Sequence, residues 1–373
     1  MKNINFKILN FDAVRNTPVF KESRSGEYIE YGSDNAYPQY LLDIFHNKSN
    51  KHKAIISKKV DMTTGNGFTE PATQELKKFI DNRYGKKDLE YVATRVNYDF
   101  EIHNGFAMLI RWNAEGTRVS AIDWLPFHKC RLSTDEQGIL VSKDWTQARK
   151  AANKPVYYPM FDPRNAKSES TQVFYYIEES NGIDYYTLPY YSSTLSWIEL
   201  DYEIATFHLA SVRNNFNAGF ILNFATGVPT EEEMADAQRE MERKFTGSEN
   251  AGKFILTFSD GQDQKPELIP LEMNSSDERF IMLHREMLTE IFIGHSVTSP
   301  LLFGIRTEGQ LGGRSELLEA LAIFQSTYIS SKQTVIEKSF AKLASFSGVS
   351  EQIKLEQYSI DFSAIESDVT PKA

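Results

Sequence analysis

The chain has little cysteine, no long apolar run and no strongly basic stretch, and each shortage excludes a class of protein. Its 373 residues include a single cysteine, Cys130, so no disulfide can form within the chain and no cysteine-based metal site is expected. No apolar run approaches the roughly 20 residues that span a bilayer. The N-terminal segment lacks an apolar core followed by a small-residue cleavage site. We therefore expect a soluble chain without a secretory leader or a membrane span.

Positive charge is also in short supply. The formal net charge is −10 and the sequence pI is about 5.4. Proteins that grip nucleic acid through its phosphates usually carry a basic patch, and only residues 48–59 form even a mildly basic run. Stable, non-specific binding to DNA is therefore disfavoured. A surface that stays near DNA without adhering to it is compatible with this charge.

Recognisable catalytic and cofactor motifs are missing as well. The histidines show no HExxH or HxH spacing, and for each one an exposed or interface position is commoner than metal ligation; they lie at 46, 52, 103, 128, 208, 284 and 295. There is no Walker A, dinucleotide-binding GxGxxG or GxSxG pattern. The loop at 309–314, GQLGGR, precedes a helix start, but it lacks the Lys-Ser/Thr of a phosphate-binding loop and follows no strand. We predict that the chain is not an enzyme and holds no metal or cofactor.

The residues that are present predict an ordinary folded core. Hydrophobic residues make up 41% of the chain, with 25 Phe and 18 Tyr among them, which argues against disorder. Residues 1–195 mix helical and strand periodicities and predict one α/β domain. The expected elements are two helices between Pro38 and Gly65 with Ser49 as the break and cap, helices at 72–84 and 88–101, and strands at 106–112 and 119–125 joined by a turn at 113–116.

A second region, residues 197–345, predicts helix, small α/β insert, helix, loop and long helix. Apolar residues at helical spacing begin the first helix at Trp197. The insert is predicted to hold a strand at 220–224, a helix opened by a capping box at Thr230 and Glu233, and β segments at 253–258 and 268–271. A second capping box, Ser275 with Glu278, predicts a helix that runs to 294.

The end of this region is dominated by one helix. A loop at 295–313 contains Pro300 and four glycines, and a helix from 314 to about 344 follows, roughly 45 Å long at 1.5 Å per residue. Its middle, 325–334, is polar nearly all round, which suggests contact with neighbouring subunits or the lining of a cavity. We expect the tail after Gly348 to be loosely ordered.

The order of these pieces resembles the portal proteins of tailed bacteriophages, of the HK97 type, over roughly residues 28–345. The stretches that carry the likeness are YGSDNAYPQYLLDIF with the following helix that ends in GNGF, HNGFAMLIRWNAEGTRVSAIDWLPFHKCRL, GVPTEEEMADAQREMERKFTGSENAGKFIL and SSDERFIMLHREMLTEIFIGHSVTSPLLFG. One departure is the split of glycine and valine at 294–297, where the family usually has a contiguous "gVPp" pattern. The order and spacing of the motifs, more than any one of them, carry the resemblance.

The resemblance implies an α+β portal fold and a division of the chain. It implies an α/β wing, a two-helix stem, a small α/β clip, a long wing helix and a short or absent crown. The corresponding residues are 1–195 for the wing, 196–215 and 273–294 for the stem, 216–272 for the clip, 295–313 for the tunnel loop, 314–345 for the long wing helix, and 346–373 for a short crown-like tail.

The resemblance further implies a ring, usually of twelve subunits, at one capsid vertex of the virion, assembled in the host cytoplasm. Double-stranded DNA would pass through its channel during packaging and ejection without specific binding. Terminase, head-completion or adaptor proteins and the major capsid protein would be its partners. The implied site residues are Gly304, Arg306, Glu308, Gln310, Gly312 and Gly313 in the tunnel loop; Glu231, Glu232, Asp236, Glu240 and Arg243 in the clip; and Asp277, Arg279, His284, Arg285 and Glu290 in the stem.

Two other interpretations stay open at the level of sequence. The acidic run on the clip helix is as often a merely solvated helix face as a functional collar. The chain could be another structural or scaffolding protein of a virion, or a hydrolase whose site the motifs do not show.

Overall fold

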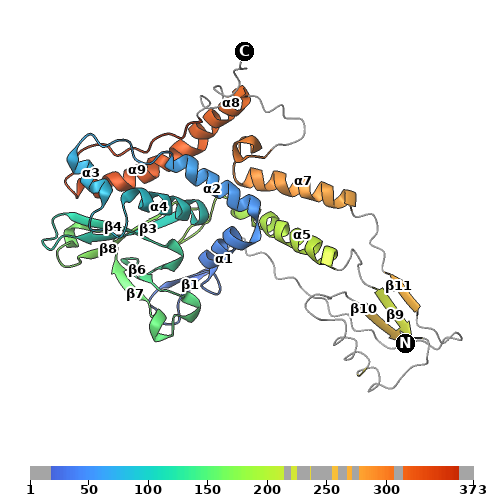
Figure 1. The fold of residues 1–373 in the computed structure, drawn as a ribbon. Coiled ribbons are helices and arrows are strands. Elements are labelled where there is room, and N and C mark those ends of the chain that lie inside the picture. The colour runs from blue at the N-terminus through green and yellow to red at the C-terminus, as the bar shows by residue number, and fades with distance from the viewer. Residues whose placement is uncertain are drawn as a thin grey trace, which may run out of the picture. The chain divides into compact units, whose positions relative to one another are not determined.

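The structure is a computed structural model that describes residues 18–213, 220–224, 236, 254–258, 267–270, 277–305 and 314–360. Its helices and sheets make an α+β fold, as the sequence predicted (Figure 1). The strands are β1 (Phe20–Glu22), β2 (Ile29–Tyr31), β3 (Gly105–Trp112), β4 (Val119–Leu125), β5 (Cys130–Leu132), β6 (Gly138–Val141), β7 (Val156–Pro159), β8 (Thr171–Ile177), β9 (Phe220–Phe224), β10 (Phe254–Phe258) and β11 (Glu267–Pro270). The α-helices are α1 (Tyr37–Asp43), α2 (Asn50–Thr64), α3 (Gln74–Asp81), α4 (Leu89–His103), α5 (Leu195–Arg213), α7 (Asp277–Gly294), α8 (Arg314–Phe324) and α9 (Ser330–Ser345).

The chain divides into two compact units. One consists of Met1–Ser196 with Glu290–Ala373, and the other of Trp197–Thr289. The chain therefore passes from the first unit to the second within α5 and returns within α7. The insert of the second unit holds a three-stranded sheet in the order β10-β9-β11, with β9 parallel to β10 and antiparallel to β11.

Antiparallel pairing organises the sheets of the first unit. The order β4-β3-β8 follows from the hairpin at 113–116, which places Ile110 opposite Ile122, and from β8, which places Val173 opposite Leu109. A second sheet has the order β5-β6-β7. Side chains from α4, β3 and α9 make the main core, among them Val96, Phe100, Phe106, Ile110, Ile336, Phe340 and Leu343. In Figure 1, α4 lies against this sheet and α9 lies beside α4.

Side-chain oxygens cap the N-termini of three helices in this unit, and the sequence predicted one of these caps, Ser49. The Ser49 hydroxyl accepts a hydrogen bond from the amide of His52 at 3.2 Å and starts α2. Thr73 and Asp88 do the same for α3 and α4. A capping oxygen satisfies an amide that has no partner within the helix. The Ser49 cap is therefore confirmed.

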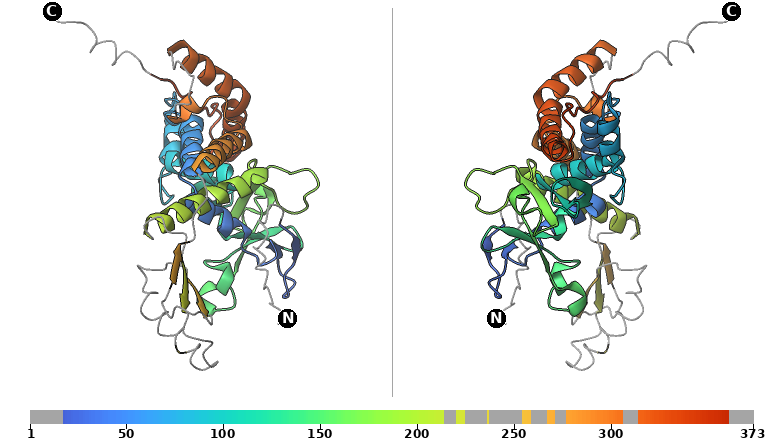
Figure 2. Two further views of the ribbon diagram at one scale, coloured as in Figure 1. Left: turned by 90° about the vertical axis from the view of Figure 1, so that its right-hand side faces the viewer. Right: turned by 90° about the vertical axis from the view of Figure 1, so that its left-hand side faces the viewer.

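The long helix is present but is not regular. A π-helical turn, Gln325–Ile329, separates α8 from α9, and both views of Figure 2 show this helix beside the blue α2. The prediction that its polar middle faces neighbours or a cavity is wrong for part of that stretch, because Lys332 and Gln333 are 3% and 7% exposed inside this chain. Their polar groups find partners within the first unit, and Gln333 Nε2 donates to the Thr63 carbonyl at 3.0 Å.

The expectation of a loosely ordered tail after Gly348 is also wrong for residues 349–360. Val349, Ile353 and Leu355 are buried in the main core. The Glu356 amide donates to the Gly67 carbonyl at 2.9 Å, so this segment runs between α2 and the long helix. Alternating buried and exposed residues give the segment an apolar edge to bury, and this edge keeps it in place. Residues 361–373 lie outside the described part of the chain.

None of the helices in the described ranges combines the length and the apolar character that crossing a membrane requires.

Candidate functional site

The residue that precedes α5 and the last residue of α7 lie against one another within the first unit. Thr194, the residue before α5, contacts Gly294, the last residue of α7. A Cβ built on Gly294 would come within 1.7 Å of the Thr194 hydroxyl oxygen. Only glycine fits at this position, so the exit into α5 and the return from α7 meet at a contact without room for a side chain.

A buried histidine pair lies next to this contact. Nδ1 of His52 is 2.9 Å from Nε2 of His295, which is the first residue after α7. The Tyr191 ring stacks on His295 at 5.0 Å and meets His52 edge-on at 4.7 Å. The Tyr191 hydroxyl donates to the Ile102 carbonyl at 2.7 Å. We call His52, Tyr191 and His295 the junction cluster.

Burial keeps both imidazoles neutral. It lowers the pKa of His52 to about 3, with a further contribution from the Lys59 ammonium. Burial lowers the pKa of His295 well below its ordinary value, and Lys59 and His52 add to the shift. One neutral imidazole can donate its N–H to the other, whereas two charged rings at this distance would repel. The junction cluster therefore joins α2 to the end of α7 through contacts between uncharged side chains.

A second buried group contains charges. Lys59 Nζ lies 3.9 Å from Glu101 Oε2, and both side chains are at most 3% exposed. The Tyr328 hydroxyl donates to the same carboxylate oxygen at 2.8 Å, and the Lys59 ammonium lies 4.0 Å from the centre of the Tyr328 ring. Tyr328 belongs to the π-helical turn, so this pair holds the irregular turn against α2 and α4.

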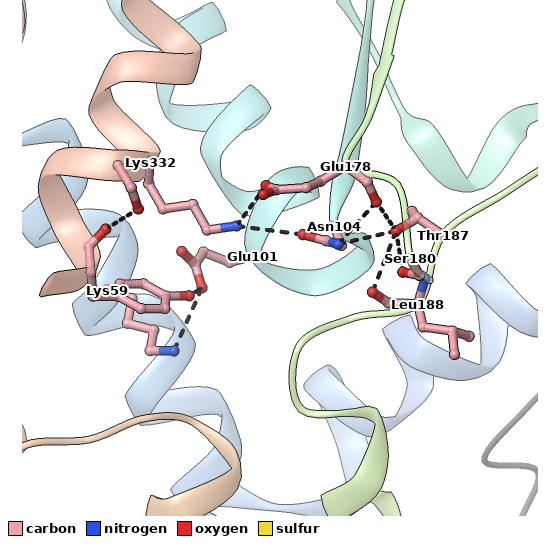
Figure 3. Close-up of polar contacts among 10 residues, drawn as sticks. Lys59, Glu101, Asn104, Glu178, Ser180, Thr187, Leu188 and Lys332 are labelled. Atoms are coloured by element: carbon pink, nitrogen blue, oxygen red, sulfur yellow. Dashed lines mark hydrogen bonds and ion pairs between the residues drawn. The ribbon is translucent and has the colours of Figure 1, made fainter. Parts of the chain in front are cut away.

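Lys332 extends the group toward the chain that leads into α5 (Figure 3). Its Nζ lies 3.5 Å from Asn104 Oδ1 and 3.9 Å from Glu178 Oε2. Asn104 Nδ2 in turn donates to the Thr187 hydroxyl at 3.0 Å, and Thr187 donates to the Glu178 carbonyl. We call Lys59, Glu101, Lys332, Asn104 and Glu178 the lysine network.

The lysines in this network are poorly hydrated cations. Burial lowers the pKa of Lys59 to about 8, although the Glu101 carboxylate opposes the shift. Burial also lowers the pKa of Lys332 to about 8, opposed by Glu101 and Glu178. The Lys332 ammonium lies 3.6 Å from the centre of the Phe100 ring, whose face attracts a cation. The network therefore ties α2, α4, α9 and the 178–187 segment together by charge.

The residues named from the sequence for the tunnel loop fall mostly outside the described ranges. Gly304 is described: it ends the short 3₁₀ helix Pro300–Phe303 with a φ of 78°, a left-handed conformation that suits glycine. Arg306, Glu308, Gln310, Gly312 and Gly313 lie outside the described residues. The predicted loop at 295–313 thus contains a turn of helix in its first part.

The stem and clip residues named from the sequence are partly described. His284 and Arg285 are exposed on α7, and Glu290 is half-buried; Asp277 begins the same helix and Arg279 follows in its first turn. Of the clip residues, Asp236 is exposed, whereas Glu231, Glu232, Glu240 and Arg243 lie outside the described ranges. The described residues contain no group of three or more His, Cys, Asp or Glu that could hold a metal ion.

Sequence reasoning missed both buried clusters. His52, His103 and His295 are at most 2% exposed, against the expectation of exposed or interface histidines. His52 lies three residues after the Ser49 cap on the buried side of α2. This position in the helix was the signal that could have predicted its burial. The spacing of five residues between Phe324 and Ile329, both buried, was a signal for the π-helical turn.

Comparisons with family models and with curated proteins give no match. Solved structures do match. A chain from the "Neck of native GTA particle computed with C12 symmetry" has 14% identity and a TM-score of 0.57 over 89% of this chain and 87% of that chain. A chain from the "Virion of native gene transfer agent (GTA) particle" has 14% identity and a TM-score of 0.55 over the same shares.

An HK97 family phage portal protein from Corynebacterium diphtheriae also matches, with 12% identity over 94% of this chain and 100% of that chain, but its TM-score of 0.45 is too low to support an argument. At such identities the likenesses concern the fold alone. They confirm that this chain shares its fold with chains found in the neck and virion of a gene transfer agent particle.

Proposed function

We propose that the chain is a portal-type protein of a virion and forms a homo-oligomeric ring there. The observation that carries the proposal is the fold shared with a chain of a gene transfer agent neck, over 89% of the present chain. That neck has C12 symmetry, and the neck of the empty particle, in which a chain of similar fold also occurs, was computed with C6 symmetry. Twelve copies of this chain are accordingly the expected number.

Exposed apolar side chains support a role for the helices in assembly. In the second unit, Phe207 and Leu209 on α5 are 41% and 51% exposed, and Met282 on α7 is 62% exposed. Large apolar side chains that stay exposed on the helices of a protomer are candidates for burial against neighbouring copies. Under the proposal, α5 and α7 form the stem, and neighbouring protomers cover these side chains.

The division of labour follows the sequence-based assignment. Residues 1–195 serve as the wing, 216–272 as the clip that docks terminase and later head-completion or adaptor proteins, and 295–313 as the tunnel loop. Double-stranded DNA passes through the channel during packaging and ejection. The net charge of −10 suits this task, because many Lys and Arg contacts to phosphate would hold the DNA in place by counterion release. No chemistry is assigned to the chain.

Electron microscopy of the purified full-length chain tests the proposal. Negative-stain images should show rings with a central hole, and class averages should give the subunit number. A population of compact monomers at micromolar concentration would contradict it. Another structural or scaffolding protein of a virion remains the second candidate, because the shared fold names a particle and no single task in it. Quantifying the copies retained per mature particle separates the two, since a portal ring is kept at one vertex.

A further inference from the structure

The outer face of α8 is apolar although the helix lies at the surface. Its inner face buries Leu321 and Phe324 in a small core with Met62 and Leu302. On the opposite face, Leu318 and Ile323 are 40% and 53% exposed, and the small Ala322 is exposed with them. Two large exposed apolar residues within two turns of one helix have no counterpart elsewhere among the described helices of the first unit.

The exposed face of α8 also carries negative charge. Glu319 lies between Leu318 and Ile323 around the helix and is exposed. Arg314, the first residue of α8, is the only basic residue of the helix, so positions 315–324 contribute carboxylates alone. A partner for this face therefore has to offer an apolar hollow together with a cation.

The first unit has a hollow of this kind on a different side. A groove of about 470 Å³ lies between α2, the Pro300–Phe303 helix and the segment around Tyr358. Its apolar lining includes Leu301, Phe303, Leu317, Tyr358 and Ile360. Lys58 lines it as well, with its ammonium 2.9 Å from the Tyr358 hydroxyl, and Asp61 lies one turn further along α2.

The exposed face of α8 and the groove beside Lys58 lie on different sides of the first unit, so they cannot contact one another within one chain. Leu317 lines the groove, while the neighbouring Leu318 points to the other side of the same helix. A contact between two different surfaces of identical chains is heterologous, and repetition of it produces a ring when the rotation closes. The ammonium of Lys58 retains donors to spare for a second acceptor, since an ammonium has three.

We propose that the outer face of α8, formed by Leu318, Glu319, Ala322 and Ile323, docks into the Lys58 groove of the next copy of this chain. This inference rests on the proposed ring and specifies two surfaces that close it. Leu318 and Ile323 enter the apolar hollow, and Glu319 pairs with Lys58 at its edge. The contact involves only the first unit, so it adds to whatever α5 and α7 contribute.

Charge reversal on the two surfaces tests the pairing in the full-length chain. We expect Glu319→Lys and Lys58→Glu each to raise the protomer concentration at half-assembly by about tenfold or more, because like charges then meet at the interface. The double variant E319K/K58E should restore assembly. Lys338→Glu, an exposed site on α9, is the matched control and should assemble like the unmodified chain. Mass photometry measures the species, and circular dichroism verifies that each variant is folded.

The outcomes separate the two proposals. If the unmodified chain gives no ring, the proposed function fails, and this inference fails with it. If the unmodified chain assembles and both single variants assemble equally well, only the docking of α8 into the groove is overturned. Single variants that dissociate without recovery in E319K/K58E also overturn the pairing of Glu319 with Lys58. Ile323→Asp, which does not involve Lys58, should dissociate the ring independently, and intact rings in that variant would count against the apolar contact.

Discussion

His52 and His295 lie 243 positions apart in the chain, yet their Nδ1 and Nε2 atoms are 2.9 Å from one another in a buried contact. His52 is a buried residue of α2, and His295 is the first residue after α7. Their contact therefore holds the end of α7 against α2 within the first unit. Both rings are neutral because burial lowers their pKa values.

The first prediction is a loss of stability in mild acid. The folded-state pKa of His52 is about 3 and its unfolded value about 6.5, so below pH 6.5 the unfolded chain binds a proton that the folded chain does not. The stabilisation is complete above pH 6.5 and decreases as the pH falls toward 3. Between pH 7 and pH 5 we expect His52 alone to lower the free energy of unfolding by about 2 kcal/mol. Urea unfolding at the two pH values measures it.

The matched variants for this prediction are His52→Gln and His46→Gln. H52Q should show a smaller loss between pH 7 and pH 5 than the unmodified chain, whereas H46Q, changed at an exposed position, should show the same loss. Asp99 acts in the opposite direction, since burial raises its pKa to about 7, but it is present in all three proteins. Equal pH dependence in H52Q and the unmodified chain would contradict the prediction.

Gly294→Ala is predicted to destabilise the junction. The added methyl group would stand 1.7 Å from the Thr194 hydroxyl oxygen and 2.5 Å from its Cβ, so the backbone or Thr194 must shift. Overpacking of this kind costs about 1–3 kcal/mol or more. Thermal unfolding should show the loss, and Thr194→Gly in the same chain should recover most of it. A double variant as unstable as G294A would show that Thr194 is not the obstacle.

Glu101→Gln is predicted to be among the most damaging single changes in the first unit. It leaves the buried Lys59 and Lys332 without their shared carboxylate and removes the charged acceptor of the Tyr328 hydroxyl. Breaking a buried ion pair from one side costs about 3–5 kcal/mol. Glu178→Gln is the control, because the Glu178 side chain is 39% exposed and water can replace it. Denaturant titrations that give equal losses for the two variants would contradict this account of the network.

Removal of residues 304–312 is predicted to leave ring assembly intact and to impair the packaging or retention of DNA. Under the proposed function these residues belong to the tunnel loop, and the helices on either side begin and end outside the deletion. Rings should still form by electron microscopy, while the DNA packaged or retained per particle should fall severalfold in a particle-producing system. Replacement of the same residues by a glycine-serine segment of equal length is the control for chain closure. Normal packaging by the deleted chain would remove the tunnel-loop assignment.

Much of the fold could be predicted because it depends on local patterns. The turn at 113–116, the Ser49 cap and the apolar spacing of α4 and α7 each act within a few residues, and the elements begin and end close to where these patterns placed them. The α+β class and the likeness in fold follow from the order of those elements.

The buried polar clusters could not be predicted in the same way. Lys332 and Gln333 look like surface residues in sequence, and only the approach of Glu101 and of the Thr63 carbonyl from α4 and α2 makes their burial possible. Segment 349–360 likewise has too few apolar residues to signal a core position by itself. Its few apolar residues become buried because backbone hydrogen bonds to Gly67 and Thr69, far away in the chain, hold the segment against the core.

The π-helical turn at Gln325–Ile329 determines the direction in which the exposed face of α8 points relative to α9. One residue more than a regular helix needs rotates everything before it by about 100° relative to α9. A single-residue deletion within the turn would therefore aim Leu318 and Ile323 at a different bearing while leaving α9 and its core untouched. The number of residues in this turn therefore sets the orientation of α8, and the insertion or deletion of one residue is the smallest change in length that would alter it.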